Sequence, residues 1–483
     1  MENPLSVFVR VRPVIKEDIN LQRKTTPDGN PIICTKCVDN NRQIILTKPY
    51  YDDREFSVDR VLPSDITQED SFELVGKNIV NEVIEGYNGT IMAYGQTGSG
   101  KTFTVFGSKS AIDAYGYENH PEGGIVPRSL HHIFNYIRAN IDEAQFLVTV
   151  SFVQIYMEII TDLLSKQKQL KGGLQIREDP KTGIFINNLE QISVQNEFEV
   201  MQIISEAAKG RSTSSTAMNK NSSRSHAVLQ VTLDQRWIEE GPPKKRRVKK
   251  GLLTIVDLAG SERLSKSGSE GLRLNEAKTI NKSISALGNC VAALAEGSNM
   301  SHVPFRDSKL TRILTDSLGG NSKTCMYACI GPTLLNYDET YSTLLFATRA
   351  MKVRTHVKIN ENVDFKINAC TEGIIQRNLL LETHNHQLKQ ELDQLKNKIQ
   401  FSPSPIMGDN SYIANSLMHE ECRCEEKQKE LVSKFTHMIQ YLQGEIARLN
   451  VVIANMQNEQ QGGGVLARLM AIPEVREKIE KYL

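Results

Sequence analysis

The segment Gly95-Gln96-Thr97-Gly98-Ser99-Gly100-Lys101-Thr102 decides the fold class, because it follows the apolar run 90–94 and has the form of a phosphate-binding loop. Its glycines allow backbone N–H groups to converge on phosphate oxygens, and a helix that starts after the loop adds its positive end. In such a loop Lys101 contacts the β- and γ-phosphates, and the Thr102 hydroxyl binds Mg²⁺. The segment therefore predicts a nucleoside triphosphate site, with a chance glycine turn as the alternative.

Two later segments carry residues that could sense a phosphate. Residues 219–226 read Asn-Lys-Asn-Ser-Ser-Arg-Ser-His, a run of hydroxyl groups around one arginine. The apolar run 252–257 ends in Asp257 and continues through Gly260 to Glu262. An aspartate at a strand end can hold the hydration shell of Mg²⁺, and a glycine lets its own N–H approach the γ-phosphate. The alternative is an ordinary parallel strand that ends in Asp by chance.

These three segments together resemble the kinesin motor domain. The resemblance extends to Arg10-Val11-Arg12-Pro13, which is similar to the adenine-side motif of that family, and to 274–287, which is similar to the long helix after the second switch. Residues 302–312 are similar to the microtubule-facing loop and helix. The resemblance covers residues 1 to about 360 and nothing convincing beyond that point.

The resemblance implies three groups of residues at an ATP site with Mg²⁺. The residues expected around the base and the phosphates are Arg10, Arg12, Pro13, Gly95, Gln96, Thr97, Gly98, Ser99, Gly100, Lys101, Thr102 and Phe103. The residues expected to act on the γ-phosphate are Ser222, Arg224, Gly260 and Glu262, with Arg224 paired to Glu262 to close the site. The expected Mg²⁺ ligands are Thr102 and Ser223, with Asp257 acting through water. We find no Asn-Lys-x-Asp segment that would read guanine, so ATP is favoured over GTP.

A set of basic residues matches positions that kinesins turn toward tubulin. They are Arg263, Lys266, Lys278, Lys282, His302, Arg306, Lys309 and Arg312. For any one of them a solvated surface position is the ordinary role, but as a set they imply contact with the acidic filament. The net charge of the chain is only +1, so this attraction must come from a local patch.

Residues 352–363 resemble the kinesin neck linker. Val353 and Val357 supply its apolar contacts, Asn360 its latch, and Thr355 stands where Asn is commoner. Only five residues precede the first expected strand, which argues against a full cover strand over the linker.

The fold class that we predict is α/β, a P-loop NTPase motor at 1–351 with a central, mostly parallel β-sheet flanked by helices. The expected strands are 6–12, 90–94, 146–156, 227–235, 252–257 and 324–330. The expected helices are 68–85, 127–139, 200–209 and 341–352.

Beyond the linker, the apolar pattern changes to heptads. We expect a short coiled coil at 372–400, weakened by Asn378 and Asn385 in its seam, and a second coiled coil at 421–460. We expect a linker with two prolines at 401–420, and a glycine-rich joint with short helices at 461–483. The coiled coils predict a homodimer; helices folded onto a neighbouring surface are the alternative.

Composition limits the location and the partners. The 8 cysteines show no zinc spacing, and we find no membrane-length apolar run or signal peptide, so we expect a soluble protein of the cytoplasm and the microtubule cytoskeleton. The basic run 244–250 is similar to a nuclear-import signal, but it lies between two expected antiparallel strands, and a solvated hairpin tip is favoured.

The resemblance implies a microtubule-stimulated ATPase that moves toward the plus end, with no particular cargo indicated. One alternative is a regulatory kinesin that binds or destabilises microtubules without walking, against which the linker argues. A P-loop motor on nucleic acid is a more distant alternative. Its second carboxylate usually follows the first directly, whereas Leu258 follows Asp257 here.

Overall fold

The computed structural model describes residues 2–22, 30–38, 40–108, 110–111, 120–165, 172–179, 183–213, 221–239, 245–262, 272–297 and 300–366. The chain divides into two compact units, Met1–Trp237 with Val248–Asn362, and Ile238–Arg247 with Val363–Leu483. The coiled coils predicted at 372–400 and 421–460, the linker 401–420 and the tail 461–483 lie outside the described residues and stay predictions.

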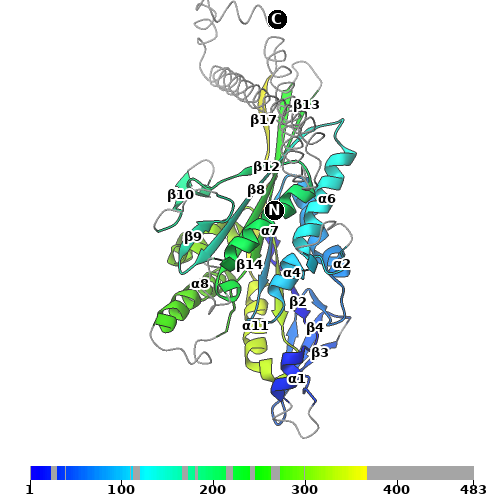
Figure 1. The fold of residues 1–483 in the computed structure, drawn as a ribbon, viewed down its shortest axis with the longest axis vertical. Helices are drawn as coiled ribbons and strands as arrows, with labels where there is room; N and C mark the ends of the chain where they lie inside the picture. The colour runs from blue at the N-terminus through cyan, green and yellow to red at the C-terminus, as the bar shows by residue number, and fades with distance from the viewer. Residues whose placement is uncertain are drawn as a thin grey trace, which may run out of the picture. The chain divides into compact units, whose positions relative to one another are not determined.

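A ten-stranded mixed sheet organises the described part of the chain (Figure 1). Its main path runs through β12 (Ile192–Val194), β8 (Gln145–Tyr156), β13 (His226–Glu239), β14 (Lys245–Asp257), β7 (Asn88–Tyr94), β15 (Lys323–Ile330), β2 (Ser6–Val11) and β6 (Arg60–Leu62). Two strands lie off this path: β9 (Ile159–Asp162) pairs with β8, and β17 (Glu361–Lys366) pairs with β14. From β14 to β6 the neighbours are parallel, whereas β12, β13 and β9 pair antiparallel with β8. The prediction of a mostly parallel sheet therefore holds for one half only.

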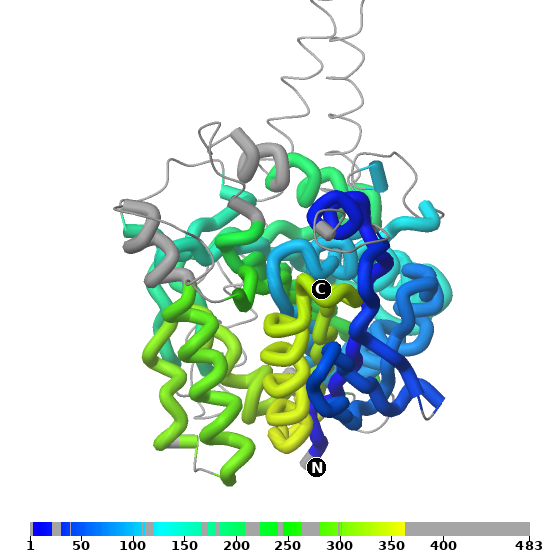
Figure 2. Tube along the Cα trace, turned by 90° about the horizontal axis from the view of Figure 1, so that it is seen from below, coloured from blue at the N-terminus to red at the C-terminus, as the bar shows by residue number. Residues whose placement is uncertain are grey.

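Helices cover both faces of the sheet. One face carries α2 (Gln68–Ser71), η1 (Phe72–Gly76), α3 (Lys77–Ile84), α4 (Lys101–Phe106), α6 (Ile125–Ala139) and α7 (Glu197–Thr213). The other face carries α8 (Leu272–Ala295), η6 (Phe305–Asp307), α9 (Lys309–Ile313), α10 (Thr315–Gly319) and α11 (Tyr337–Ala350). Figure 2 shows α8 and α11 side by side.

The alternation of β7 explains the two layers. Ile91 and Ala93 join the core cluster that contains side chains of α3, α6 and α7, whereas Met92 and Tyr94 join the cluster that contains side chains of α8 and α11. Successive side chains of a strand point to opposite faces, so an almost wholly apolar strand such as this one is buried on both sides. This burial fixes the strand whose carboxyl end continues into the glycine loop.

All six expected strands and all four expected helices form, with shifted ends. The terminal helix starts at Tyr337, four residues before the prediction, because Asp338 and Glu339 stabilise its first turn. The helix expected at 68–85 contains a π-helical turn, Phe72–Gly76. Just before that turn, the Ser71 carbonyl accepts a hydrogen bond from the buried Tyr327 hydroxyl at 3.0 Å. Two small sheets were not predicted: β3 (Thr35–Val38), β4 (Gln43–Leu46) and β5 (Arg54–Ser57), and β10 (Ile176–Asp179) with β11 (Gly183–Ile186).

The N-terminal residues form a short strand despite their number. β1 (Glu2–Pro4) pairs antiparallel with β16 (Arg354–His356) of the linker segment. The Thr355 hydroxyl, fully buried, donates to the Asn3 carbonyl at 3.3 Å. The expectation that no full cover strand is present agrees with a strand of three residues, but this short strand does cover the linker. No helix among the described residues is long and apolar enough to cross a membrane.

Candidate functional site

The glycine loop lies between the end of β7 and the start of α4, as predicted. Gly95, Gly98 and Gly100 have φ values of 146°, 77° and 97°, which disfavour any residue with a Cβ. A Cβ at Gly95 would lie 2.1 Å from the Cys329 carbonyl oxygen. The loop therefore needs glycine at Gly95 for space as well as for conformation.

The loop holds Lys101 in a defined place. Its Nζ donates to the Gly95 and Gln96 carbonyl oxygens, each at 2.8 Å. Burial lowers the pKa of Lys101, and the nearby Asp257 and Glu262 carboxylates oppose this. The ammonium group thus lies inside the loop, where a bound phosphate would compensate its charge.

Thr102 and Asp257, predicted at the Mg²⁺ site, are in contact. The Thr102 hydroxyl donates to Asp257 Oδ2 at 2.7 Å, because parallel pairing of β14 with β7 places Asp257 opposite Ala93, next to the loop. Among the described residues no group of three or more His, Cys, Asp or Glu forms a metal cage. One hydroxyl and one carboxylate fit Mg²⁺, which in nucleotide sites takes few protein ligands and completes its shell with phosphates and water.

The segment after Asp257 packs directly on the loop. The Gly260 N–H donates to the Ser223 carbonyl at 2.9 Å, and the Ser261 N–H donates to the Gly95 carbonyl at 3.1 Å. Glu262 accepts from the Thr97 N–H at 2.8 Å and from the Thr97 hydroxyl. The structure therefore brings Gly260, Glu262 and Ser223 to the loop.

Two expected participants are less completely placed. Arg224 lies in η3 (Asn221–Arg224), and its expected ion pair with Glu262 stays a prediction. Ser222 lies in the same turn, but its side chain is outside the described part. The contact of Glu262 with Thr97 was not predicted.

On the adenine side, the structure modifies the expected roles. Arg10 is buried and donates to Gln68 Oε1 at 2.7 Å and to the Thr104 hydroxyl at 3.0 Å. Its guanidinium carbon lies 5.6 Å from the centre of the Phe103 ring, which is 39% exposed. Gln68, which the sequence analysis missed, donates to the Phe103 carbonyl at 2.6 Å. Phe103 thus offers an open ring for a base, and Arg10 supports this ring from the buried side.

Arg12 takes part in a polar network that the motifs did not indicate. Both its terminal nitrogens donate to Asp18, at 2.5 and 2.9 Å. Burial alone would raise the pKa of Asp18, but hydrogen bonds from Arg12, Ile15 and Asn336 lower it overall. The Gln96 side chain donates to Asn336 Oδ1, so the network links the loop to the residue that precedes α11.

The basic residues that the structure describes gather on neighbouring elements. Lys282 lies on α8, His302 in η5 (Met300–His302), Arg306 in η6, and Lys309 and Arg312 on α9. Lys282, His302 and Arg306 are exposed, and α8 packs against both η6 and α9. Arg263 and Lys266 lie outside the described residues, as does the side chain of Lys278.

Glu158 holds the start of α9, a role that no sequence motif indicated. Its carboxylate accepts from the Ser308 hydroxyl at 2.8 Å and from the Lys309 N–H at 2.7 Å. Met157 and Glu158 form the two-residue turn between β8 and β9 with positive φ values of 50° and 59°. Such turns favour Asn-Gly, so this one is strained. The pair Met157-Glu158 carries no turn signal in the sequence, so this role could not be found there.

The linker residues lie against the motor core. Val353 and Val357 are buried, and the Leu5 N–H donates to the Val353 carbonyl at 3.0 Å. The Asn360 N–H donates to the Gly86 carbonyl at 2.9 Å, and the Asn360 carbonyl accepts from the Lys250 N–H at 2.9 Å. Its side-chain amide lies 3.1 Å from the Gly86 carbonyl, 2.7 Å from Asn88 Oδ1 and 3.1 Å from the Lys250 carbonyl.

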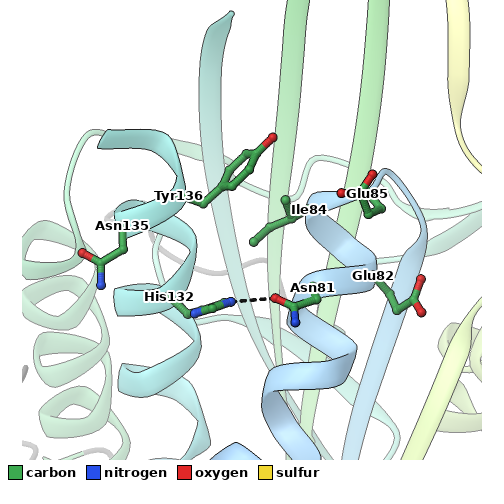
Figure 3. Close-up of a pocket in the computed structure, with 7 residues that line it drawn as sticks. All are labelled: Asn81, Glu82, Ile84, Glu85, His132, Asn135 and Tyr136. Carbon is green, nitrogen blue, oxygen red and sulfur yellow. Dashed lines mark hydrogen bonds between the residues drawn. The ribbon is translucent and has the colours of Figure 1, made fainter. Parts of the chain in front are cut away.

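A groove of about 650 Å³ between α3 and α6 lies apart from these residues (Figure 3). It is lined by Asn81, Glu82, Ile84, Glu85, His132, Asn135 and Tyr136. The side chains of His132 and Asn81 are hydrogen-bonded across it at 2.7 Å. None of the predicted site residues lines it, so the groove is not the nucleotide site.

Comparison with known proteins agrees with this geometry. The family model of the kinesin motor domain matches residues 10–353. The chain is 41% identical over 378 residues to Kinesin-related protein 5 of Dictyostelium discoideum, which covers 77% of this chain and 35% of that protein. It is 42% identical over 360 residues to Kinesin-like protein klp-20 of Caenorhabditis elegans, with 74% and 52% covered.

Two further matches add information. Kinesin-like protein KIN-UB of Arabidopsis thaliana is 34% identical over 471 residues, 94% of this chain and 49% of that protein. This similarity continues past the motor residues, further than the motifs indicated. A solved structure titled "Structure of a fast kinesin: Implications for ATPase mechanism and interactions with microtubules" aligns with a TM-score of 0.65 and 36% identity, covering 74% of this chain and 94% of that one. The chain spans between 35% and 52% of the length of these three curated relatives.

Proposed function

The chain belongs to the kinesin motor family, and on this premise we propose that it hydrolyses ATP under stimulation by microtubules and converts the energy into movement along them. The observation that carries the proposal is that Lys101, Thr102 and Asp257 meet at the carboxyl ends of β7 and β14. Asn360 is bound to Gly86 and Lys250, just before the opposite end of the segment over which these two strands pair. Nucleotide chemistry and linker docking thus share one pair of strands. Kinesin motor domains are microtubule-stimulated ATPases.

At the nucleotide site, Lys101 would balance the charge that develops on the transferred phosphoryl group. Thr102 and Ser223 would hold Mg²⁺, with Asp257 acting through water, and the ion would neutralise the β- and γ-phosphate oxygens. The Gly260 N–H now donates to the Ser223 carbonyl, so it would change partner to reach a γ-phosphate. Arg224 and Glu262 would then close the site, with Ser222 sensing the same phosphate.

The described basic residues on α8, η5, η6 and α9 form the surface that we assign to tubulin, whose filament is acidic. With a net charge of +1, attraction must come from this face rather than from bulk charge. Arg306 lies 3.6 Å from Glu178, and both side chains are exposed. A carboxylate of tubulin would take the place of Glu178 as the partner of Arg306.

The direction that we propose is toward the plus end, by docking of the linker along the motor core. The burial of Val353 and Val357 and the bonds of Asn360 support this, because docking throws the following segment forward. The same contacts argue against a regulatory kinesin that does not walk. We further propose that the segments 372–400 and 421–460 form a homodimer through coiled coils.

We propose that the protein works in the cytoplasm on the microtubule cytoskeleton. The described part of the basic run, Lys245 to Lys250, lies within β14 rather than at the hairpin tip where we expected it. Arg247 pairs with Glu239 at 2.9 Å, and Lys250 lies 3.7 Å from Asp234. An import signal is bound as a free extended peptide, and a segment that lies within a strand and is ion-paired does not present that form.

Two assays on the full chain test the proposal. ATPase activity is measured with microtubules and, separately, with DNA, and only microtubules should stimulate it. Polarity-marked microtubules are then glided by surface-bound protein, and leading minus ends support plus-end movement. Leading plus ends would refute the direction, and filament binding without gliding at saturating ATP would favour the regulatory alternative.

A further inference from the structure

The resemblance implied no role for His226, the last residue of the segment 219–226. It is 2% exposed, it starts β13, and it directly follows the serine-arginine segment. Both of its ring nitrogens have partners from other parts of the chain. The Ala259 N–H donates to Nδ1 at 3.0 Å, and Nε2 lies 2.7 Å from the Ser283 hydroxyl oxygen.

These partners fix the protonation of the ring. A backbone N–H can only donate, so Nδ1 carries the lone pair, and the single proton of the neutral ring lies on Nε2 and is donated to Ser283. Burial lowers the pKa of His226 to about 3, and the Lys101 ammonium adds to this effect. The ring is therefore neutral at ordinary pH and acts as a directional link from the Ala259 N–H to the Ser283 hydroxyl.

The two partners belong to the parts of a motor that must communicate. Ala259 immediately precedes Gly260, whose N–H would change partner on binding of a γ-phosphate. Ser283 lies on α8 and is buried, whereas the preceding Lys282 is exposed on the surface that we assign to tubulin. Adjacent residues of a helix point in different directions, so α8 presents one residue to His226 and the next to the filament.

We propose that His226 is a positioning residue that couples the phosphate-sensing segment to α8 through the Ala259–His226–Ser283 hydrogen bonds. The proposal rests on the microtubule-stimulated ATPase proposed above. Breaking either bond would leave a buried polar group without its partner. When Ala259 shifts, a matching shift of α8 therefore keeps both bonds and is favoured, and the reverse also holds. Filament binding that holds α8 therefore biases the segment that contacts the γ-phosphate.

The test uses the full chain with Ser283→Ala, which removes the acceptor on α8 and keeps the Ala259 bond. Ser285→Ala is the matched control, because Ser285 lies two residues further on the same helix and is exposed. For Ser283→Ala we expect nucleotide affinity and basal ATPase within about twofold of the original protein. We expect the stimulation by saturating microtubules to fall at least about fivefold, within the usual range of coupling between sites. Ser285→Ala should retain it.

His226→Asn supplies a second, independent variant. The Asn oxygen can replace Nδ1 as acceptor for the Ala259 N–H, but the shorter side chain does not reach Ser283. We expect the same loss of stimulation, and no further loss in the double variant, because both changes break one link. Ser283→Thr restores the hydroxyl and should restore stimulation.

The outcomes separate this inference from the proposed function. If microtubules do not stimulate the original protein, the proposed function fails. If they do, and Ser283→Ala behaves as Ser285→Ala, the coupling role of His226 is refuted. Basal activity and stimulation that fall in equal proportion, or losses that add in the double variant, show a structural role only and also overturn it.

Discussion

The segment over which β7 and β14 pair, Asn88–Ala93 with Leu252–Asp257, has a different kind of binding site at each end. At the carboxyl ends, Lys101, Thr102 and Asp257 present an ammonium, a hydroxyl and a carboxylate. At the opposite ends, Asn360 is held mainly by the main-chain groups of Gly86 and Lys250. The seven residues of β7 separate the two ends by about 20 Å, at the usual rise along a strand.

The difference teaches which kind of site a motif can reveal. Phosphate and Mg²⁺ select particular side chains, so the residue types in the sequence are enough to identify the site at the carboxyl end. A carbonyl oxygen is present at every residue, so the receptor for Asn360 has almost no signature in the sequence. Gly86 is the exception, because its φ of 89° favours glycine.

The largest effect that we expect is at the carboxyl end. Lys101→Ala removes the charge that compensates the phosphoryl group, and microtubule-stimulated ATP turnover should fall at least about 100-fold in a steady-state assay. Lys77→Ala, at an exposed helix position that pairs with Glu73, is the control and should leave turnover unchanged. Turnover within threefold of the original in Lys101→Ala would show that the loop is not the catalytic phosphate site.

Lowering the pH should lower the free energy of unfolding through His226, whose ring is hydrogen-bonded to Ala259 just after β14. Its pKa is about 3 when folded and ordinarily near 6.5, so the unfolded chain takes up a proton more readily. The stability due to neutral His226 is full above about pH 6.5 and is lost as the pH falls toward 3. At pH 5 this residue alone should cost about 2 kcal/mol, roughly a 30-fold change in the folding equilibrium.

Urea unfolding at pH 7 and pH 5, followed by the fluorescence of Trp237, measures this loss. In His226→Asn the difference between the two pH values should be smaller by about the same amount. An equal difference in both proteins would mean that His226 is accessible to protons in the folded state.

At the opposite end of the paired segment, Asn360→Ala should weaken linker docking about tenfold, since it removes the side-chain bonds and leaves the main-chain ones. Gliding velocity should fall several-fold, whereas ATPase activity without microtubules should stay within twofold. Asn362→Ala changes an exposed neighbour and serves as the control. Unchanged velocity in Asn360→Ala would show that Asn360 does not act as a latch and that its bonds do not link nucleotide turnover to movement.

The smallest effect concerns Glu158, whose carboxylate holds the Ser308 hydroxyl and the Lys309 N–H. Glu158→Gln keeps an acceptor oxygen but loses the charge that holds the Lys309 N–H. Co-sedimentation over a salt series should show affinity for microtubules reduced about two- to fivefold. The exposed Glu69→Gln should not change affinity. Equal affinity for Glu158→Gln at every salt concentration would limit Glu158 to a local role in the turn.

Sequence reasoning located the parallel half of the sheet and the loop at its edge because both leave regular patterns. The runs 90–94 and 252–257 are apolar on both faces, and the glycines of 95–100 have conformations that few other residues adopt. The start of α11 was misplaced by four residues, because Asn336, Asp338 and Glu339 mark it with polar rather than apolar residues.

The missed site residues share one property: each acts on a residue distant in the sequence. Gln68 supports Phe103, Asn336 contacts Gln96, and Glu158 holds Lys309. Glutamine, asparagine and glutamate are common on any surface, and nothing local distinguishes these three. Only folding, which brings the turn after β8 to α9 and the start of α11 to the glycine loop, gives them partners.

The sequence by itself determined that this chain belongs with the kinesin motors, and it predicted the nucleoside triphosphate site, because phosphate and Mg²⁺ demand specific residues at fixed spacing. The tertiary structure alone decided that β8, β13 and their neighbours make the sheet mixed, that Arg10 acts from beneath Phe103, and that three residues before β2 cover the linker. These features depend on pairing between segments that are tens to hundreds of residues apart or on burial by neighbouring layers. A local sequence pattern does not identify such partners. Backbone hydrogen bonds and packing between apolar side chains are possible in many arrangements of the same segments.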